Sequence, residues 1–119
     1  MKILITAQGQ NSTDAVDQRF GRASYHIIHD TEADTYAAID NAAQLNAAQG
    51  AGVQAAQNAV AGGAEAVLTG HCGPKAFDVL AAAGVSIYSG ITGTVVDAVG
   101  AWKRDELEQL SGPDGTPSH

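Results

Sequence analysis

Cysteine, aromatic residues and positive charge are all scarce in this chain. Its 119 residues include one cysteine, 5% aromatic residues, and six lysines and arginines against thirteen acidic residues. A single cysteine excludes an internal disulfide framework, so the sequence is compatible with a reducing compartment. The net charge of −7 disfavours nucleic acids and anionic membranes as partners, because both are normally bound by a basic surface.

Long apolar runs are absent as well. No uninterrupted apolar segment approaches the roughly 18 residues that a membrane span requires. The first strand-like run, Lys2-Ile-Leu-Ile-Thr6, is not preceded by the pattern of a secretion signal, and we therefore expect a cytoplasmic protein. The length favours one domain, which we place at residues 1–110, followed by a flexible tail at 111–119 that contains Gly, Pro and Ser.

The apolar pattern predicts an α/β fold. Five short runs rich in β-branched or aromatic residues predict strands at 3–5, 25–29, 35–39, 66–68 and 85–88. Helical spacing and stop signals predict helices at 51–61, 74–83 and 94–110. Right-handed crossovers would make the last two strands parallel to the first, with the hairpin antiparallel beside it. The loops 8–23, 70–75 and 89–94 would then meet at the carboxyl edge of the sheet, where such folds bind ligands.

Half of the cationic side chains lie in two short loops that contain glycine. The segment 17–22 carries Arg19 and Arg22, and the segment 69–75 carries Lys75. Guanidinium groups suit anions with several oxygen or sulfur atoms, so we expect at least one arginine to contact an anion. The structural alternative is that Asp14 or Asp17 pairs with an arginine to fix the loop.

Three predicted helices begin just after a glycine. Gly73-Pro74-Lys75 opens one helix, and Gly50-Ala-Gly52 and Gly93-Thr94 precede the other two. The free amides at a helix start favour an anion. Three such starts at one edge predict an anion-binding nest, whereas each alone could be an ordinary helix start with a solvated lysine.

His71 and Cys72 stand next to each other in the second loop. A metal site built from side chains needs three or four ligands at set spacing, and the sequence contains no CxxC or HxxxH. A preformed cluster that carries its own sulfide would need only backbone donors, cations and at most one thiolate or imidazole. The alternative, a buried cysteine beside a surface histidine, stays open. His26 and His29 should point to opposite faces of a strand and are interpreted as packing and surface residues.

Catalysis is not expected. The chain offers no evident pair of nucleophile and base, and Asp17, Asp30 and Asp40 are scattered rather than convergent. We interpret the chain first as a carrier of a metal–sulfide cluster. The main alternative is a binding module for a phosphorylated metabolite or nucleotide, and the third is an enzyme that uses Cys72. The sequence contains neither a P-loop nor a GxGxxG motif after the first strand.

Three segments in register resemble the dinitrogenase iron–molybdenum cofactor family. They are Val16-Asp-Gln-Arg-Phe-Gly-Arg-Ala23, Gln49-Gly-Ala-Gly52 and Gly73-Pro-Lys-Ala-Phe77. The resemblance extends over roughly residues 2–110 of a family that includes NifX, the cofactor-binding domain of NafY and the C-terminal part of NifB. A chain this small and acidic is most similar to the orange proteins of sulfate-reducing bacteria.

This resemblance implies a three-layer ribonuclease-H-like fold, with a five-stranded mixed sheet of order 3-2-1-4-5 and helices on both faces. It also implies non-covalent binding of a molybdenum–copper sulfide cluster, without catalysis, and partnership with Mrp/MinD-type ATPases. Taken with the loops above, it gives a set of candidate cofactor-binding residues in which His71 and Cys72 are the candidate metal ligands. The set is Arg19, Phe20, Gly21, Arg22, Gly50, His71, Cys72, Gly73, Pro74 and Lys75.

Overall fold

Six strands form one sheet that is covered by helices in this computed structural model, which describes residues 1–41 and 51–110. The strands are β1 (Lys2–Ala7), β2 (Tyr25–Asp30), β3 (Thr35–Asp40), β4 (Ala66–Leu68), β5 (Ser86–Ser89) and β6 (Glu108–Gln109). The helices are α2 (Ala51–Ala61), α3 (Pro74–Ala82) and α4 (Val95–Lys103). Gly50 and the expected tail lie outside the described residues.

The strand order is β3-β2-β1-β4-β5-β6. Strands β1, β4 and β5 are parallel, whereas the β2–β3 hairpin continues the sheet antiparallel to β1. The α/β class and the order 3-2-1-4-5 expected from the sequence are therefore confirmed, and a sixth strand is added at the far edge. None of the helices in residues 1–41 and 51–110 is long and apolar enough to cross a membrane.

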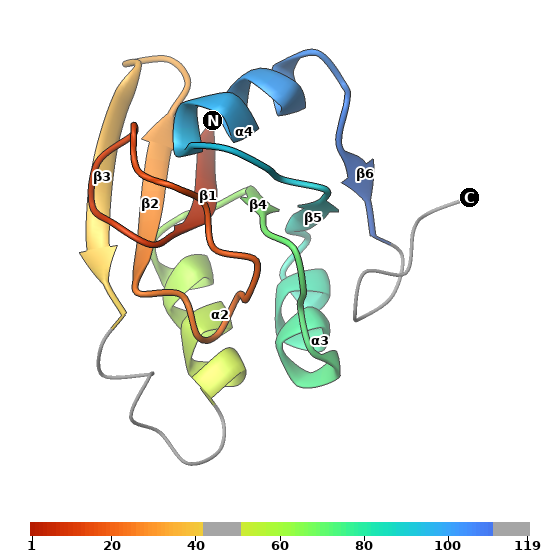
Figure 1. Ribbon diagram of the computed structural model, residues 1–119. Coiled ribbons are helices and arrows are strands. Elements are labelled where there is room, and N and C mark those ends of the chain that lie inside the picture. The colour runs from red at the N-terminus through yellow and green to blue at the C-terminus, as the bar shows by residue number, and fades with distance from the viewer. Residues whose placement is uncertain (42–50, 111–119) are drawn as a thin grey trace.

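The sheet separates two hydrophobic cores, because successive side chains of a strand point to opposite faces. In β1, Leu4 belongs to the core beneath α2 and α3, whereas Ile3 and Ile5 belong to the core beneath α4. Figure 1 shows α2 and α3 side by side and α4 apart from them. Burial of each such side chain contributes about 1.5–3 kcal/mol to the free energy of folding.

The last helix is shorter than the sequence predicts. A helix over 94–110 was expected, but α4 ends at Lys103 and the chain returns as β6, antiparallel to β5. Asp105 adopts a left-handed backbone with φ of 59°, which a continuing helix cannot contain. Leu107 is still buried against α4, and Leu110 donates its amide to the carbonyl of Ile87. The helical prediction over 104–110 is wrong.

The long connection at 8–24 folds back over the carboxyl ends of the parallel strands. It forms isolated bridges to three other parts of the chain, Ala7 with Val16, Ala15 with Thr94 and Arg19 with His71. This connection therefore covers the edge at which β4 and β5 end and their helices begin. The sequence-based expectation that the loops gather at this edge is met by these bridges.

Candidate functional site

The two loops that contain most of the candidate residues lie side by side. Gly70 and His71 both donate their amides to the carbonyl of Gln18, and Phe20 donates its amide to the carbonyl of His71 at 3.1 Å. Glycine is needed at position 70, because a Cβ there would overlap Oε1 of Gln18 and lie 2.8 Å from the Gln18 carbonyl oxygen. This close backbone contact fixes the position of one loop relative to the other.

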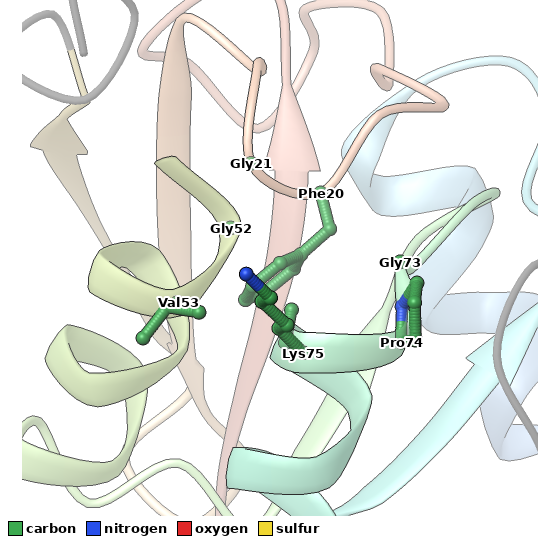
Figure 2. Close-up of a pocket in the computed structure, with 8 residues that line it drawn as sticks. Phe20, Gly21, Gly52, Val53, Gly73, Pro74 and Lys75 are labelled. Atoms are coloured by element: carbon green, nitrogen blue, oxygen red, sulfur yellow. The ribbon is translucent and has the colours of Figure 1, made fainter. Parts of the chain in front are cut away.

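A cavity of about 270 Å³ opens between these loops and the first turns of α2 and α3. Its lining consists of Phe20, Gly21, Gly52, Val53, Gly73, Pro74, Lys75 and Ala76. Figure 2 shows the Lys75 side chain extending over this space, with Phe20 behind it and Gly52 to one side. We refer to this cavity as the edge pocket. The candidate set from the sequence does not include Gly52, Val53 or Ala76, because none of the three carries a charged or polar side chain that would mark it as a binding residue.

The start of α3 offers unpaired donors to the edge pocket. Gly73 is the N-cap and supplies no side-chain cap, and Pro74 occupies the first turn, where its missing N–H costs nothing. The amides of Lys75 and Ala76 donate to no atom within the described part of the chain. Since such orphan amides and the helix dipole favour negative charge, this helix start suits an anion.

The amide donors at the start of α4 already have acceptors within the protein. Thr94 and Asp97 form a reciprocal capping box, with Thr94 accepting from the Asp97 amide at 3.2 Å. The amides of Val95 and Val96 donate to carbonyl oxygens of the 8–24 connection. The expectation that all three glycine-marked helix starts join one anion nest is therefore wrong for α4, whose donors are already used.

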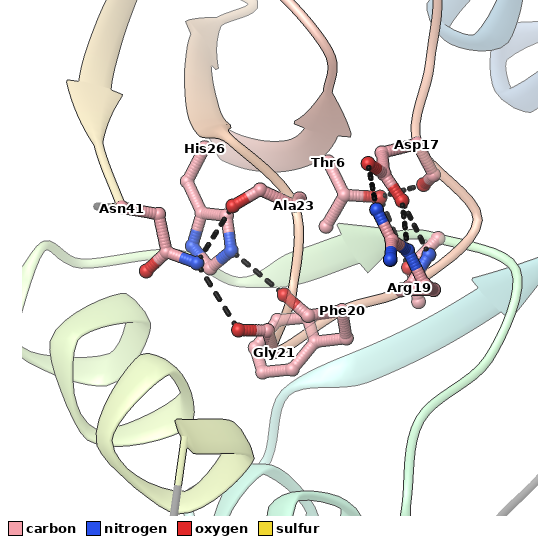
Figure 3. Close-up of polar contacts among 9 residues, drawn as sticks. Thr6, Asp17, Arg19, Phe20, Gly21, Ala23, His26 and Asn41 are labelled. Atoms are coloured by element: carbon pink, nitrogen blue, oxygen red, sulfur yellow. Dashed lines mark hydrogen bonds and ion pairs between the residues drawn. The ribbon is translucent and has the colours of Figure 1, made fainter. Parts of the chain in front are cut away.

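The three cations of the two loops have different surroundings. Lys75 lines the edge pocket, whereas neither Arg19 nor Arg22 does. The Arg19 guanidinium contacts the buried carboxylate of Asp17, with Nε 3.2 Å from Oδ1 and Nη2 3.3 Å from Oδ2 (Figure 3). Hydrogen bonding and the charge of Asp17 raise the pKa of Arg19. This ion pair corresponds to the alternative in which an acidic residue pairs with an arginine to fix the loop. The Arg19 side chain nevertheless remains 64% exposed.

His71 and Cys72 also differ in their surroundings. His71 is exposed, and its backbone, through the bridge to Arg19, is what joins the loops. Cys72 is fully buried in the core beneath α2 and α3, together with Phe20 and Leu80. The structure thus places the cysteine as a packed core residue and the histidine at the surface.

Two buried polar side chains of the hairpin support the pocket wall, and sequence reasoning missed both. His26 Nε2 lies 2.9 Å from the carbonyl oxygen of Phe20, and Asn41 Nδ2 donates to the carbonyls of Gly21 and Ala23 (Figure 3). A carbonyl oxygen only accepts, so the proton of neutral His26 sits on Nε2. Burial lowers the pKa of His26, which keeps the imidazole neutral near pH 7.

Among residues 1–41 and 51–110, no three His, Cys, Asp or Glu side chains gather as a ligand set for a metal ion. The donors that face the edge pocket are instead an ammonium group and backbone amides, and none of its lining residues is acidic. Such donors fit the outer atoms of a polyatomic anion. A cluster whose metals are already coordinated by sulfide presents such atoms, whereas a bare metal cation does not.

Fold and site together define a three-layer α/β protein with a pocket between two helix starts. A family model described as dinitrogenase iron-molybdenum cofactor matches residues 1–105. The chain belongs to this family, which confirms the resemblance noted in the sequence. A comparison with curated proteins finds no match.

Solved structures agree with this assignment. The chain is 36% identical to the orange protein from Desulfovibrio gigas, solved in its apo form, with a TM-score of 0.91 over 95% of each chain. It is 34% identical to a putative NifB protein from Thermotoga, with a TM-score of 0.82 over 92% of this chain and 93% of the other. A putative dinitrogenase from Methanocaldococcus jannaschii, 16% identical with a TM-score of 0.69 over 95% and 97%, shares the fold.

Proposed function

We propose that the protein binds and carries an anionic metal–sulfide cluster that contains molybdenum, and that it performs no catalysis. The observation that carries this proposal is the composition of the edge pocket. On a chain of net charge −7, its lining holds the ammonium group of Lys75 and no carboxylate. A cavity that excludes acidic side chains from an acidic protein is suited to negative charge.

The edge pocket combines charge with a soft apolar wall. Lys75 and the orphan amide of Ala76 supply hydrogen-bond donors, whereas Phe20 and Val53 supply apolar surface. Sulfide atoms of a thiometallate are large and polarisable, so they can accept from the donors and pack against the apolar side chains. Because apolar side chains form part of the wall, a charge interaction there should be stronger than in bulk water.

Family membership supports the choice of ligand. The family is described by the iron–molybdenum cofactor of dinitrogenase, and one similar chain is the orange protein from Desulfovibrio gigas. On the resemblance alone we propose copper as the second metal of the cluster, Mrp/MinD-type ATPases as partners and the cytoplasm as the location. The outer donors of the site, in this proposal, are Arg19, Arg22 and His71.

Titration of the apo-protein with tetrathiomolybdate, followed by visible absorption, tests the proposal. We expect a saturable change in the visible bands that excess inorganic phosphate and ATP do not reverse. The Arg19→Ala/Arg22→Ala double variant should fold and bind more weakly, because charge-assisted contacts to the anion are lost. Unchanged bands together with tight ATP binding would instead identify a nucleotide module.

A further inference from the structure

We infer that His26 and Asn41 are positioning residues of the edge pocket, because they turn the Gly21 amide toward the ligand. The inference rests on the proposed function and deepens it by naming residues that act on the site without lining it. It begins from a feature that core packing alone does not require: two buried polar side chains hold consecutive carbonyl groups of one pocket wall.

The contacts involve two residues that are each only 4% exposed. His26 donates from Nε2 to the carbonyl of Phe20 at 2.9 Å. Asn41 donates from Nδ2 to the carbonyl of Gly21 at 3.2 Å and to that of Ala23 at 2.8 Å. Figure 3 shows both side chains on the hairpin side of this segment.

Peptide geometry converts these contacts into a direction for the amides. The described chain contains no cis peptide bond, so the C=O of one residue and the N–H of the next point in opposite directions. With the Phe20 carbonyl turned to His26, the Gly21 N–H points away from the hairpin. The Gly21 carbonyl turned to Asn41 directs the Arg22 N–H in the same way.

The Gly21 amide is available as a donor. Gly21 lines the edge pocket, and its N–H donates to no atom within residues 1–41 and 51–110. A main-chain donor in the loop would therefore complement the amides at the start of α3 on the opposite wall. Main-chain N–H groups that converge on one concave space favour an anion there. His26 and Asn41 each hold one of these peptides in that orientation through its carbonyl oxygen.

The experiment compares tetrathiomolybdate affinity across variants of matched stability. His26→Phe keeps the ring volume and removes the donor, whereas His26→Gln keeps a donor. Asn41→Leu removes both amide hydrogen bonds. The control is His29→Phe, because His29 is also fully buried and holds a carbonyl, that of Thr35 at 3.1 Å, but it faces the α4 core.

We expect His26→Phe and Asn41→Leu each to weaken binding about tenfold, which corresponds to the loss of one well-aligned donor. His26→Gln should restore most of the affinity, and His29→Phe should leave it unchanged. In the wild-type protein, the Gly21 amide resonance should shift downfield as tetrathiomolybdate saturates the site, and this shift should be smaller in folded Asn41→Leu, which a purely structural role for Asn41 would not produce.

The outcomes separate this inference from the proposed function. Wild-type affinity in folded His26→Phe and Asn41→Leu, or an equal loss in His29→Phe, overturns the inference and leaves the carrier function standing. If a variant fails to fold, the wild-type spectrum decides, since a Gly21 amide that does not shift at saturation also overturns it. Failure of the wild-type protein to bind tetrathiomolybdate overturns both.

Discussion

Gln18 and Gly70 are packed so closely that no side chain fits between them. The Gly70 amide donates to the Gln18 carbonyl at 3.1 Å, and a Cβ at position 70 would lie 2.9 Å from the Gln18 Cα. This contact joins the two loops on which the candidate site is built. The geometry of the edge pocket therefore depends on a glycine that does not line it.

Gly70→Ala should lower the free energy of unfolding by about 1–3 kcal/mol, because overpacking forces the two backbones apart. It should also weaken tetrathiomolybdate binding, since the loop wall moves away from α3. Urea unfolding measures the first effect, and the visible titration measures the second.

Gly73→Ala is the matched control in the same loop. Gly73 has an ordinary φ of −65°, and a Cβ added there would meet no atom within 4 Å, so alanine should fit with little change in stability. Equal destabilisation by both substitutions would show that close packing against Gln18 is not what Gly70 provides.

Lys75 and Lys103 allow the charge of the edge pocket to be tested separately from the charge of the protein. Both are exposed lysines, but Lys103 lies in the last turn of α4 and is not among the pocket residues. Lys75→Gln should weaken tetrathiomolybdate binding about tenfold or more, through loss of a charge-assisted contact. Lys103→Gln changes the net charge equally and should have little effect. Similar losses in the two variants would point to a diffuse field instead of a pocket.

His26 should make stability depend on pH in weak acid. Burial lowers its pKa below the usual 6.5, so between the lowered value and 6.5 the unfolded chain binds a proton that the folded chain does not. This contribution is complete above about pH 6.5 and is lost as the pH falls through the folded pKa. Urea midpoints at about pH 7.5 and about pH 5 should differ more for the wild type than for His26→Gln. An equal pH dependence in the two proteins would assign the effect to other groups.

Cys72 should be a packing residue and not a ligand. Its side chain is fully buried, so the thiol of the folded apo-protein should react slowly with an alkylating agent. Cys72→Ala should lower stability by about 1 kcal/mol and keep the binding stoichiometry. A variant that folds but binds no cluster would make the cysteine a ligand.

The sequence predicted the elements that depend on local pattern. The β1 run Ile3-Leu-Ile5 and the Gly73-Pro74 helix start are recognisable from composition and spacing, and right-handed crossovers then determine the strand order. The end of α4 could not be predicted in this way. Leu107 and Leu110 are three residues apart, as on a helix face, and only the pairing of β6 with β5 decides the conformation.

The candidate site could be predicted only in part, because a local pattern marks some of its residues while others depend on contacts between distant segments. Lys75 and Gly73 follow directly from a strand–loop–helix motif. The hydrogen bonds of Asn41 to Gly21 and Ala23 join residues that are distant in the sequence, and an asparagine at the end of a strand carries no signal of such contacts. The closure of α4 by the 8–24 connection likewise depends on how that connection folds, which no local pattern specifies.

Analysis of molybdenum and sulfide in the protein purified from its own host tests the central proposal most directly. An anionic cluster carrier should retain both elements in fixed ratio to protein and show visible charge-transfer bands, and denaturation should release the cluster. A colourless preparation without molybdenum, carrying extra absorbance near 260 nm from a bound nucleotide, would contradict it.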